Sequence, residues 1–524
     1  MLFSRGDAGK KEKEKPTIER IEAGLEKSDA FPSDVTLTEG PTEFAAPRKI
    51  ARENASQIHE IFGAYQAAET DLPKHPAEYL KYWPGYQGYI GDFEARSAIR
   101  HDGQYLIRLE DVKDKTNILI CSGEPLRHDK QWRRPGMPDE AIKDSNPVIR
   151  VRTHVVEKDK RGFFSIEDDY CFESVEDLLS FYVFHGEKSK LAAQLRYAVP
   201  RRIFQFKPHY IERIKKLGAG AFGDVSLAAI SRPGLLNKRA VVKAVKLGLT
   251  NTAELSQKLI EEGRCMLNLN HPNVIQIYGW CLDSHPLMLL FEYMPCGALD
   301  LFLLENFECT SVRHLVRFAL DAAQGLAYIH SQNLIHRDIA ARNCLLTKKG
   351  KVKLADFGLC VRGRFFRMRK AERLPTRYVA PESLIYFVFV PKSDCYTYGN
   401  LLFEIFSGGS MPYENLTSPE IRERILHGLT NKMPSRTPDS LLRFTEDRIW
   451  AYALAERPNA YEIVEFLQNV LKGVKNEAME TTVAEEKEDY THNEDNARKR
   501  TRRRKLRREE VLEDFCPTQE DLAA

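Results

Sequence analysis

Two short segments in the second half of the chain carry side chains suited to phosphoryl transfer. One is "HRDIAARN", residues 336–343, and the other is "ADFG", residues 355–358. Asp338 can accept the proton of an attacking hydroxyl group, while Asn343 and Asp356 offer the hard oxygen ligands that Mg²⁺ prefers. Their order predicts that Asp338 acts as the catalytic base and that Asn343 and Asp356 bind the metal.

A glycine-rich segment, "LGAGAFGDV", lies upstream at residues 217–225. Glycines at this spacing let a strand–turn–strand unit close over phosphates without side-chain clashes. A dinucleotide-binding fold uses similar spacing but needs a helix directly after the glycines, whereas "DVSLAAI" continues here as a strand. The pattern therefore favours a phosphate-covering loop of the kinase type. The predicted nucleotide-binding residues are Leu217, Gly218, Gly220, Gly223 and Val225.

A strand lysine and a helix glutamate are expected to complete the nucleotide site. The lysine lies in "AVVKAVK", where Lys243 is the preferred candidate and Lys246 fits a second register. On a strand with apolar neighbours, such a lysine can reach the α and β phosphates of ATP. The helical segment "LIEEGRCML" supplies the partner carboxylate, for which Glu262 is preferred over Glu261.

These motifs occur in a fixed order and are followed by "APE" at residues 380–382, and residues 211–473 resemble a protein kinase catalytic domain. "HRDIAARN" is similar to the tyrosine-kinase catalytic loop, which gives Arg342 a catalytic role beside Asp338. "LPTRYVAPE" resembles a tyrosine-kinase motif in which Tyr378 replaces a tryptophan.

The same resemblance assigns several supporting roles. "SDCYTYG" makes Asp394 the support of the catalytic-loop backbone, and "AERPN" pairs Arg457 with Glu382. Phe291 takes the gatekeeper position before the hinge. The expected ligands are ATP and Mg²⁺, with Mn²⁺ as an alternative, and the expected substrates are proteins that bear tyrosine.

Upstream, "GQYLIRLE" resembles the strand of an SH2 domain that carries a buried phosphotyrosine-binding arginine, here Arg108. His154 in "RTHVV" matches a histidine that lines the same pocket. "NILICSG", "GFFSI" and "SVEDLLSFYVF" predict two further strands and a helix. However, carboxylates at Asp92, Glu110 and Asp111 are unfavourable beside a phosphate group. Phosphotyrosine proteins are the expected partners, through a weakened pocket.

The two resemblances imply an α+β chain, in which an SH2 domain with a central antiparallel sheet and two flanking helices precedes a two-lobed kinase fold. The predicted divisions are a flexible charged arm (1–75), an SH2 domain with a long insert (80–185), a linker (186–209), a kinase domain (210–473) and a disordered tail (474–524). "RYAVPRR" in the linker resembles the Fes/Fer subfamily of non-receptor tyrosine kinases.

Composition and charge are consistent with an intracellular protein. The ten cysteines form no C-x-x-C pair, and the net charge is only +3. No apolar run is long enough for a signal peptide or a transmembrane helix. We expect a cytoplasmic location, with a peripheral-membrane or nuclear fraction as alternatives. The basic segment 497–508 would contact an anionic membrane, an importin or an acidic partner, unless it folds back on the acidic residues before it.

The segment "VRGRFFRMRKAER", residues 361–373, occupies the position of a kinase activation loop but contains no tyrosine. Phe365 or Phe366 stands where related kinases carry a phosphorylated tyrosine. A phosphate there would bind arginines that include Arg337. We therefore expect activity without activation-loop tyrosine phosphorylation. The loop would be ordered by packing of the rings, by SH2 docking, or by an acidic partner.

Two functions remain open from the sequence. The complete set of catalytic residues favours an active tyrosine kinase in signal transduction, and the alternative is an SH2–pseudokinase scaffold in phosphotyrosine signalling. A second open question is the apolar run "LIYFVFV", residues 384–390. It is either packed in the core or exposed as a docking patch for a partner.

Overall fold

A computed structural model describes residues 75–112, 115–125, 149–185, 195–219, 223–246, 252–369 and 374–474. The chain divides into two compact units. The N-terminal unit contains the described residues up to 263 and residues 277–293. The C-terminal unit contains residues 264–276 and those from 294 onward.

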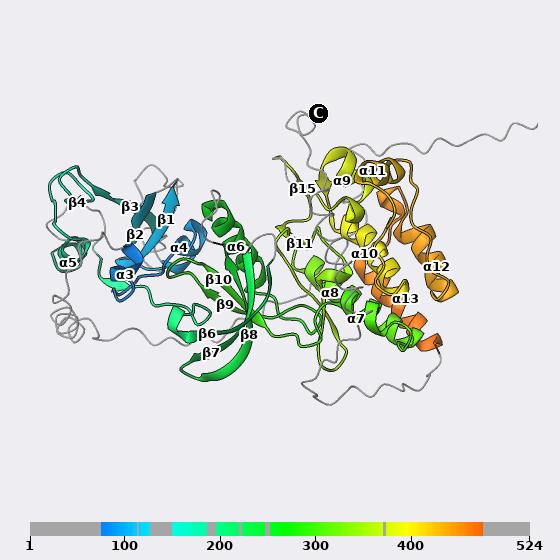
Figure 1. The fold of residues 1–524 in the computed structure, drawn as a ribbon. Coiled ribbons are helices and arrows are strands. Elements are labelled where there is room, and N and C mark those ends of the chain that lie inside the picture. Colours follow the sequence, from blue (N-terminus) through cyan, green and yellow to red (C-terminus); the bar gives the residue numbers. More distant parts are fainter. Residues whose placement is uncertain are drawn as a thin grey trace, which may run out of the picture. The chain divides into compact units, whose positions relative to one another are not determined.

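The N-terminal unit begins with a five-stranded sheet in the order β4-β3-β2-β1-β5 (Figure 1). Its strands are β1 (Gln104–Val112), β2 (Lys115–Pro125), β3 (Ile149–Lys158), β4 (Phe164–Ser165) and β5 (Tyr197–Ala198). Strands β1, β2 and β3 are antiparallel neighbours, so Arg108 faces Leu119 across the first pair. The helices are α3 (Pro76–Leu80), α4 (Asp92–Ala98) and α5 (Val175–Phe184).

The second sheet of this unit has the strand order β6-β7-β8-β10-β9. It consists of β6 (Ile211–Ala219), β7 (Gly223–Arg232), β8 (Leu235–Val245), β9 (Ile277–Cys281) and β10 (Met288–Glu292), with helix α6 (Thr252–Met266) between β8 and β9. Alternating small and branched apolar side chains of β7, β8 and β10 bury one face together with Phe206. The period of two along these strands is what a half-buried sheet requires.

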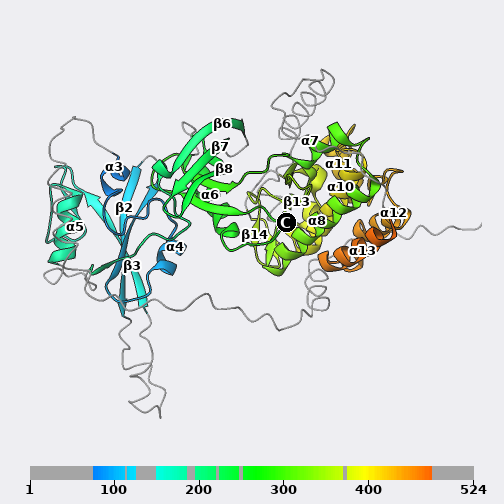
Figure 2. The same cartoon turned by 90° about the horizontal axis from the view of Figure 1, so that it is seen from below.

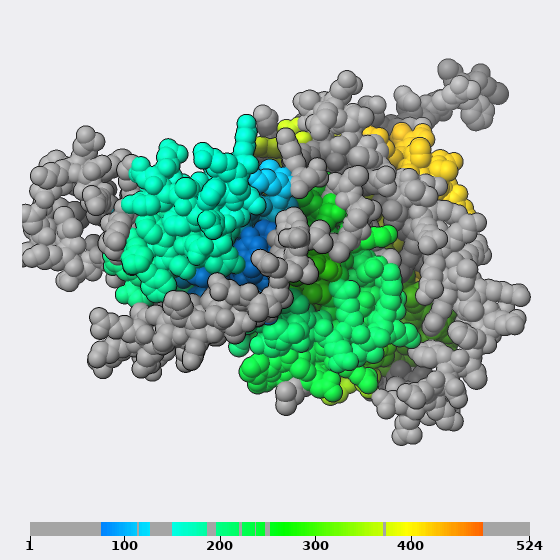
Figure 3. All heavy atoms as spheres, turned by 60° about the vertical axis from the view of Figure 1, so that its left-hand side comes forward, coloured from blue at the N-terminus to red at the C-terminus, as the bar shows by residue number. Residues whose placement is uncertain are grey.

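The two sheets of the N-terminal unit lie side by side in Figures 2 and 3, and a hydrogen bond and an ion pair join them. The Tyr89 backbone N–H donates to the Leu282 carbonyl at 2.8 Å. Gly88 has a φ of 69°, and a Cβ at this position would overlap the same carbonyl group. Only glycine therefore permits this close approach without strain. Arg201 forms an ion pair with the buried carboxylate of Asp283 nearby.

The C-terminal unit is mainly helical. Its helices are α7 (Leu299–Asn306), α8 (Val312–Ser331), α9 (Pro381–Tyr386), α10 (Pro391–Phe406), α11 (Ser418–Leu426), α12 (Asp439–Phe444) and α13 (Ala460–Gly473). Helices α8, α10 and α13 lie beside one another (Figure 1) and bury most of the side chains of α8 and α10. In the part of the chain that the structure describes, no helix is both long and apolar enough to cross a bilayer.

Short strand pairs shape the loops of this unit. Strand β11 (Leu334–Ile335) pairs with β14 (Val361–Arg362), β12 (Cys344–Leu346) with β13 (Val352–Leu354), and β15 (Phe366–Arg367) with β16 (Val388–Phe389). The third pair attaches the segment around Phe366 to the apolar run at residues 384–390. Short helical turns occur at Pro208–Tyr210, Ala341–Asn343, Thr376–Tyr378, Thr445–Ile449 and Leu454–Glu456.

The apolar run "LIYFVFV" is packed inside the C-terminal unit. Leu384, Phe387 and Phe389 belong to a buried cluster with Ile335 and Met368, and each is at most 4% exposed. Val388 and Val390 are fully buried in a second cluster. The docking-patch hypothesis is therefore wrong for this run, because five of its seven side chains are buried in the protein's own core and the other two, Ile385 and Tyr386, are half-buried.

The strands and the helix that the sequence predicts between residues 104 and 184 are present at the predicted places. Several other predictions fall outside the described residues. These are the arm before residue 75, most of the long insert after β2, Gly220, and the acidic and basic tail after residue 474.

Candidate functional site

The candidate catalytic loop follows strand β11 in the C-terminal unit. Within it, the Arg342 guanidinium donates from Nη2 to Oδ1 of Asp338 at 2.6 Å. The Asn343 side-chain amide donates to the other oxygen, Oδ2, also at 2.6 Å. Because both oxygens of Asp338 accept hydrogen bonds, the carboxylate has a fixed orientation. The structure thus brings together three of the predicted site residues, and the group available there is a partly buried proton acceptor.

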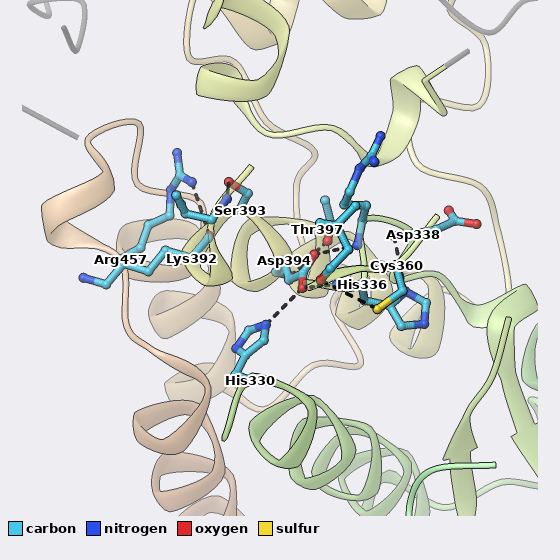
Figure 4. Close-up of polar contacts among 12 residues, drawn as sticks. His330, His336, Asp338, Cys360, Lys392, Ser393, Asp394, Thr397 and Arg457 are labelled. Atoms are coloured by element: carbon cyan, nitrogen blue, oxygen red, sulfur yellow. Dashed lines mark hydrogen bonds and ion pairs between the residues drawn. The ribbon is translucent and has the colours of Figure 1, made fainter. Parts of the chain in front are cut away.

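Asp394 in helix α10 anchors the backbone of this loop (Figure 4). Its carboxylate accepts the backbone N–H groups of His336 at 2.7 Å and Arg337 at 2.9 Å. His330 Nε2 lies 3.0 Å from the same carboxylate. Arg337 has a φ of 69°, an uncommon conformation for a residue with a side chain. The buried carboxylate thus contacts the backbone of the strained turn, which is the place that the family resemblance assigns to it.

A second anchor on helix α10 was not predicted from the sequence. Glu404 is fully buried and accepts the Ala341 N–H at 2.7 Å and the Tyr378 hydroxyl at 2.9 Å. The Tyr378 ring lies under the Arg342 guanidinium, with 4.5 Å between Cζ and the ring centroid. Tyr378 therefore links the buried carboxylate to the arginine that orients Asp338. The only signal in the sequence was a tyrosine at a position where the related motif has tryptophan.

A buried ion pair supports the segment after Tyr378. Arg457 donates to both carboxylate oxygens of Glu382 at 2.8 Å, and its side chain is fully buried. Ser393 also donates to Glu382, at 2.6 Å. This is the pair that the sequence resemblance assigns, in bidentate geometry with additional hydrogen bonds.

The N-terminal unit contains the predicted lysine–glutamate pair. Lys243 Nζ on β8 lies 2.9 and 2.8 Å from the two oxygens of Glu262 on α6. Lys246 is exposed at the end of the strand, and Glu261 instead accepts a hydrogen bond from Gln257. The geometry favours Lys243 and Glu262 over the alternative register.

The described residues of the glycine-rich segment lie at the end of β6 and at the start of β7 in the same unit. Gly218 pairs with Val225 across the two strands, and a Cβ on Gly218 would meet open space. By contrast, a Cβ on Gly223 would overlap the carbonyl group of Ala244 on the next strand. The glycine at 223 is thus required by strand packing. Leu217 is exposed at the sheet edge.

Two other predicted site residues are Asp356 in the C-terminal unit and Phe291 in the N-terminal unit. Asp356 is exposed and has a φ of 60°, and the Gly358 N–H lies 3.4 Å from its Oδ1. Phe291 on β10 is 9% exposed and faces Val241 of β8 across the strand pair.

Arg108 lies on β1 with its side chain only 5% exposed. Its Nη1 is 3.3 Å from Glu110 Oε1, and its Nη2 is 3.8 Å from Asp92 Oδ1. Within the described residues its buried Nε has no hydrogen-bond partner. His154 on β3 lies 3.5 Å from Ser122 Oγ, and burial lowers the pKa of its imidazole. Two carboxylates therefore already flank the arginine that is predicted to bind phosphotyrosine.

Asp111, which the sequence placed beside this pocket, points elsewhere. Its Oδ2 lies 2.7 Å from His285 Nε2, and Thr116 donates to its Oδ1 at 2.7 Å. Hydrogen bonds from His285 and Thr116 outweigh the effect of burial and lower the pKa of this carboxyl group. Successive strand residues face opposite sides of a sheet, so Glu110 and Asp111 cannot both face Arg108.

Comparisons with known proteins agree with this arrangement. Residues 211–467 match the family model of the protein tyrosine and serine/threonine kinase domain. The chain is 34% identical to Fer-related kinase 1 of Caenorhabditis elegans over 368 residues, which are 70% of this chain and 88% of that protein. It is 32% identical to the tyrosine-protein kinase transforming protein Fps of an avian sarcoma virus (strain PRCII) over 248 residues, covering 47% and 45% of the two chains.

The chain is also similar to the spermatocyte protein spe-8. It is 30% identical to the C. elegans protein over 348 residues, which are 66% of this chain. The match covers 63% of that protein and 62% of its Caenorhabditis briggsae counterpart. The chain thus spans a little under two thirds of these relatives.

Proposed function

Because this chain belongs to the Fer-related family of protein tyrosine kinases, we propose that it transfers the γ-phosphoryl group of ATP to tyrosine side chains of other proteins. The observation that carries the proposal is the arrangement around Asp338. Arg342 and Asn343 hold the two carboxylate oxygens, and Asp394 fixes the backbone on which all three side chains depend. A positioned carboxylate is the group that can accept the proton of the substrate hydroxyl.

The described side chains fit ATP and Mg²⁺. Asn343 and Asp356 would hold the ion. Two oxygen ligands from the protein suit Mg²⁺, which keeps water and substrate phosphates in its coordination shell. Bound Mg²⁺ would neutralise charge on the transferring phosphoryl group, and Mn²⁺ could replace it. Lys243, oriented by Glu262, would contact the α and β phosphates.

The test is a transfer assay with the purified full chain, Mg·ATP and a random glutamate–tyrosine copolymer. We expect phosphotyrosine to accumulate and a serine–threonine substrate to remain unmodified. A folded chain that binds ATP but transfers no phosphate above the background of an inactive variant would support the scaffold alternative instead.

We also propose that residues 80–185 form an SH2 domain with a weakened phosphotyrosine pocket. Support comes from the antiparallel β1–β2–β3 sheet, from helices α4 and α5, and from the buried guanidinium of Arg108. Asp92 and Glu110 would weaken the pocket, because they compete with the phosphate for that guanidinium and repel its charge.

The strength of this pocket can be measured by titrating the full chain with a fluorescent phosphotyrosine peptide. We expect the double variant Asp92→Asn/Glu110→Gln to bind about tenfold more tightly, from two exposed charge contacts of up to about 1 kcal/mol each. Arg108→Ala should abolish binding, whereas Asp102→Asn, an exposed carboxylate on the turn before β1, serves as the matched control. Equal affinity for wild type and Arg108→Ala would reject the pocket.

We further propose that activity needs no phosphate on the activation segment. Phe366, not tyrosine, lies on strand β15, and this strand is already paired with β16. Treatment of the purified chain with a tyrosine phosphatase should therefore change its specific activity by less than about twofold. The assay follows initial rates after the phosphatase is removed, and a large loss of activity would contradict the expectation.

A further inference from the structure

The guanidinium of Arg337 contacts two aromatic rings that come from separate segments of the C-terminal unit. Its Cζ is 4.8 Å from the ring centroid of Phe366 and 4.5 Å from that of Phe389. The two centroids are only 6.3 Å apart, so the rings flank the cation on adjacent sides rather than on opposite faces. Both distances are within the range at which a ring attracts a cation. We refer to Phe366 and Phe389 as the aromatic corner.

Backbone pairing holds both rings of the aromatic corner. Phe366 is directly opposite Phe389 in the β15–β16 pair, and the Met368 N–H donates to the Phe387 carbonyl at 2.9 Å. Met368 is 1% exposed in the same core cluster as Phe389, and Phe366 packs against that cluster. The neighbouring Phe365 is 37% exposed. Of the two adjacent phenylalanines, Phe366 is therefore the one that reaches the arginine.

Arg337 connects the aromatic corner to the reaction through the backbone. It lies between His336 and Asp338, and Asp394 accepts its N–H at 2.9 Å. The residue is 5% exposed and adopts the strained φ of 69°. A cation that is nearly excluded from water interacts more strongly with an aromatic quadrupole than an exposed one. The position of this side chain therefore affects the backbone that carries Asp338.

We propose that Phe366 and Phe389 are positioning residues, whose rings hold Arg337 and thereby order the activation segment and the catalytic loop without a phosphate group. This inference deepens the proposed kinase function and rests on it. The attraction depends on the negative face of each ring and adds no charge to a segment that already contains six basic residues among thirteen. The apolar run at residues 384–390 supplies the ring of Phe389, and the segment without tyrosine supplies the ring of Phe366.

The sharpest test replaces Phe366 with phenylalanines that carry one, two or three fluorine atoms. Fluorine withdraws electron density from the ring face while changing its shape little, so the cation–π attraction falls stepwise. We expect kcat to fall stepwise with fluorination, and to fall about tenfold in Phe366→Leu, while KM for ATP stays within about twofold. Phe366→Tyr, assayed after phosphatase treatment, should keep most of the activity because its ring face is intact. Fluorination of Phe365 is the matched control and should leave kcat unchanged.

A second readout does not depend on catalysis. Hydrogen exchange at the Met368 amide should become faster in Phe366→Leu and in the trifluorinated variant, because the β15–β16 contact loosens when the ring no longer binds the cation. Unchanged kcat and unchanged exchange in these variants, with an active wild type, would overturn the inference. An inactive wild type whose Met368 exchange still responds to fluorination would refute the proposed activity and leave the aromatic corner standing.

Discussion

Replacement of Asp338 by asparagine is expected to lower kcat for phosphotyrosine formation by a factor of about 10³ or more. General acid–base groups contribute roughly 10² to 10⁴ to enzymatic rates. The variant also loses orientation, since Arg342 and Asn343 both donate to the carboxylate and an amide can accept through only one of its two terminal atoms. Initial rates with the glutamate–tyrosine copolymer measure the loss.

Nucleotide affinity separates this effect from misfolding. Asp338→Asn should bind a fluorescent ATP analogue within about threefold of the wild type, because Lys243 and the glycine-rich segment are unchanged. Asp447→Asn, an exposed carboxylate in the same unit, is the control and should retain full activity. If Asp338→Asn kept wild-type turnover, the activity would come from a contaminating kinase.

Replacement of Arg457 by methionine should destabilise the C-terminal unit by about 3–5 kcal/mol, because it leaves the carboxylate of Glu382 buried without its cation. The guanidinium also donates to the carbonyl groups of Ala451 at 2.7 Å and Tyr452 at 3.1 Å, and these would lose a partner as well. Urea unfolding followed by far-ultraviolet circular dichroism gives the change in the free energy of unfolding.

The double variant Glu382→Gln/Arg457→Met tests whether the unpaired charge is the cause. We expect it to recover a large part of the lost stability, since no buried charge remains, so the two substitutions should be strongly non-additive. Arg443→Met removes an exposed arginine of helix α12 and should change stability by less than about 0.5 kcal/mol. Additive effects of the two buried substitutions would mean that packing, and not the charge pair, dominates.

Some contacts between predicted site residues could be predicted from the sequence, because these residues lie in motifs whose order resembles that of a protein kinase. Lys243 meets Glu262, and Asp394 supports the loop before Asp338, as the motifs indicated. The roles of these residues in catalysis remain predictions.

Contacts between distant segments were harder to predict. The register that places Phe366 opposite Phe389 depends on which strands pair, and the sequence alone does not specify this. The link from Glu404 to Tyr378 depends on two residues that are brought together only by folding. By contrast, the alternation of side chains along a strand is enough by itself to predict that Glu110 and Asp111 face opposite sides of the sheet.

Helix α10 holds the catalytic loop at two places, through the carboxylates of Asp394 and Glu404. Asp394 accepts hydrogen bonds from the backbone N–H groups of residues 336 and 337. Glu404, about three helical turns further along α10, accepts the N–H of Ala341. A buried helix changes its length very little, so the distance between the carboxylates of Asp394 and Glu404 is nearly constant. The loop therefore cannot stretch or slacken by itself, and any movement of its backbone must be shared with the core of the unit. Heat inactivation of this chain should accordingly coincide with unfolding of α10 and not precede it.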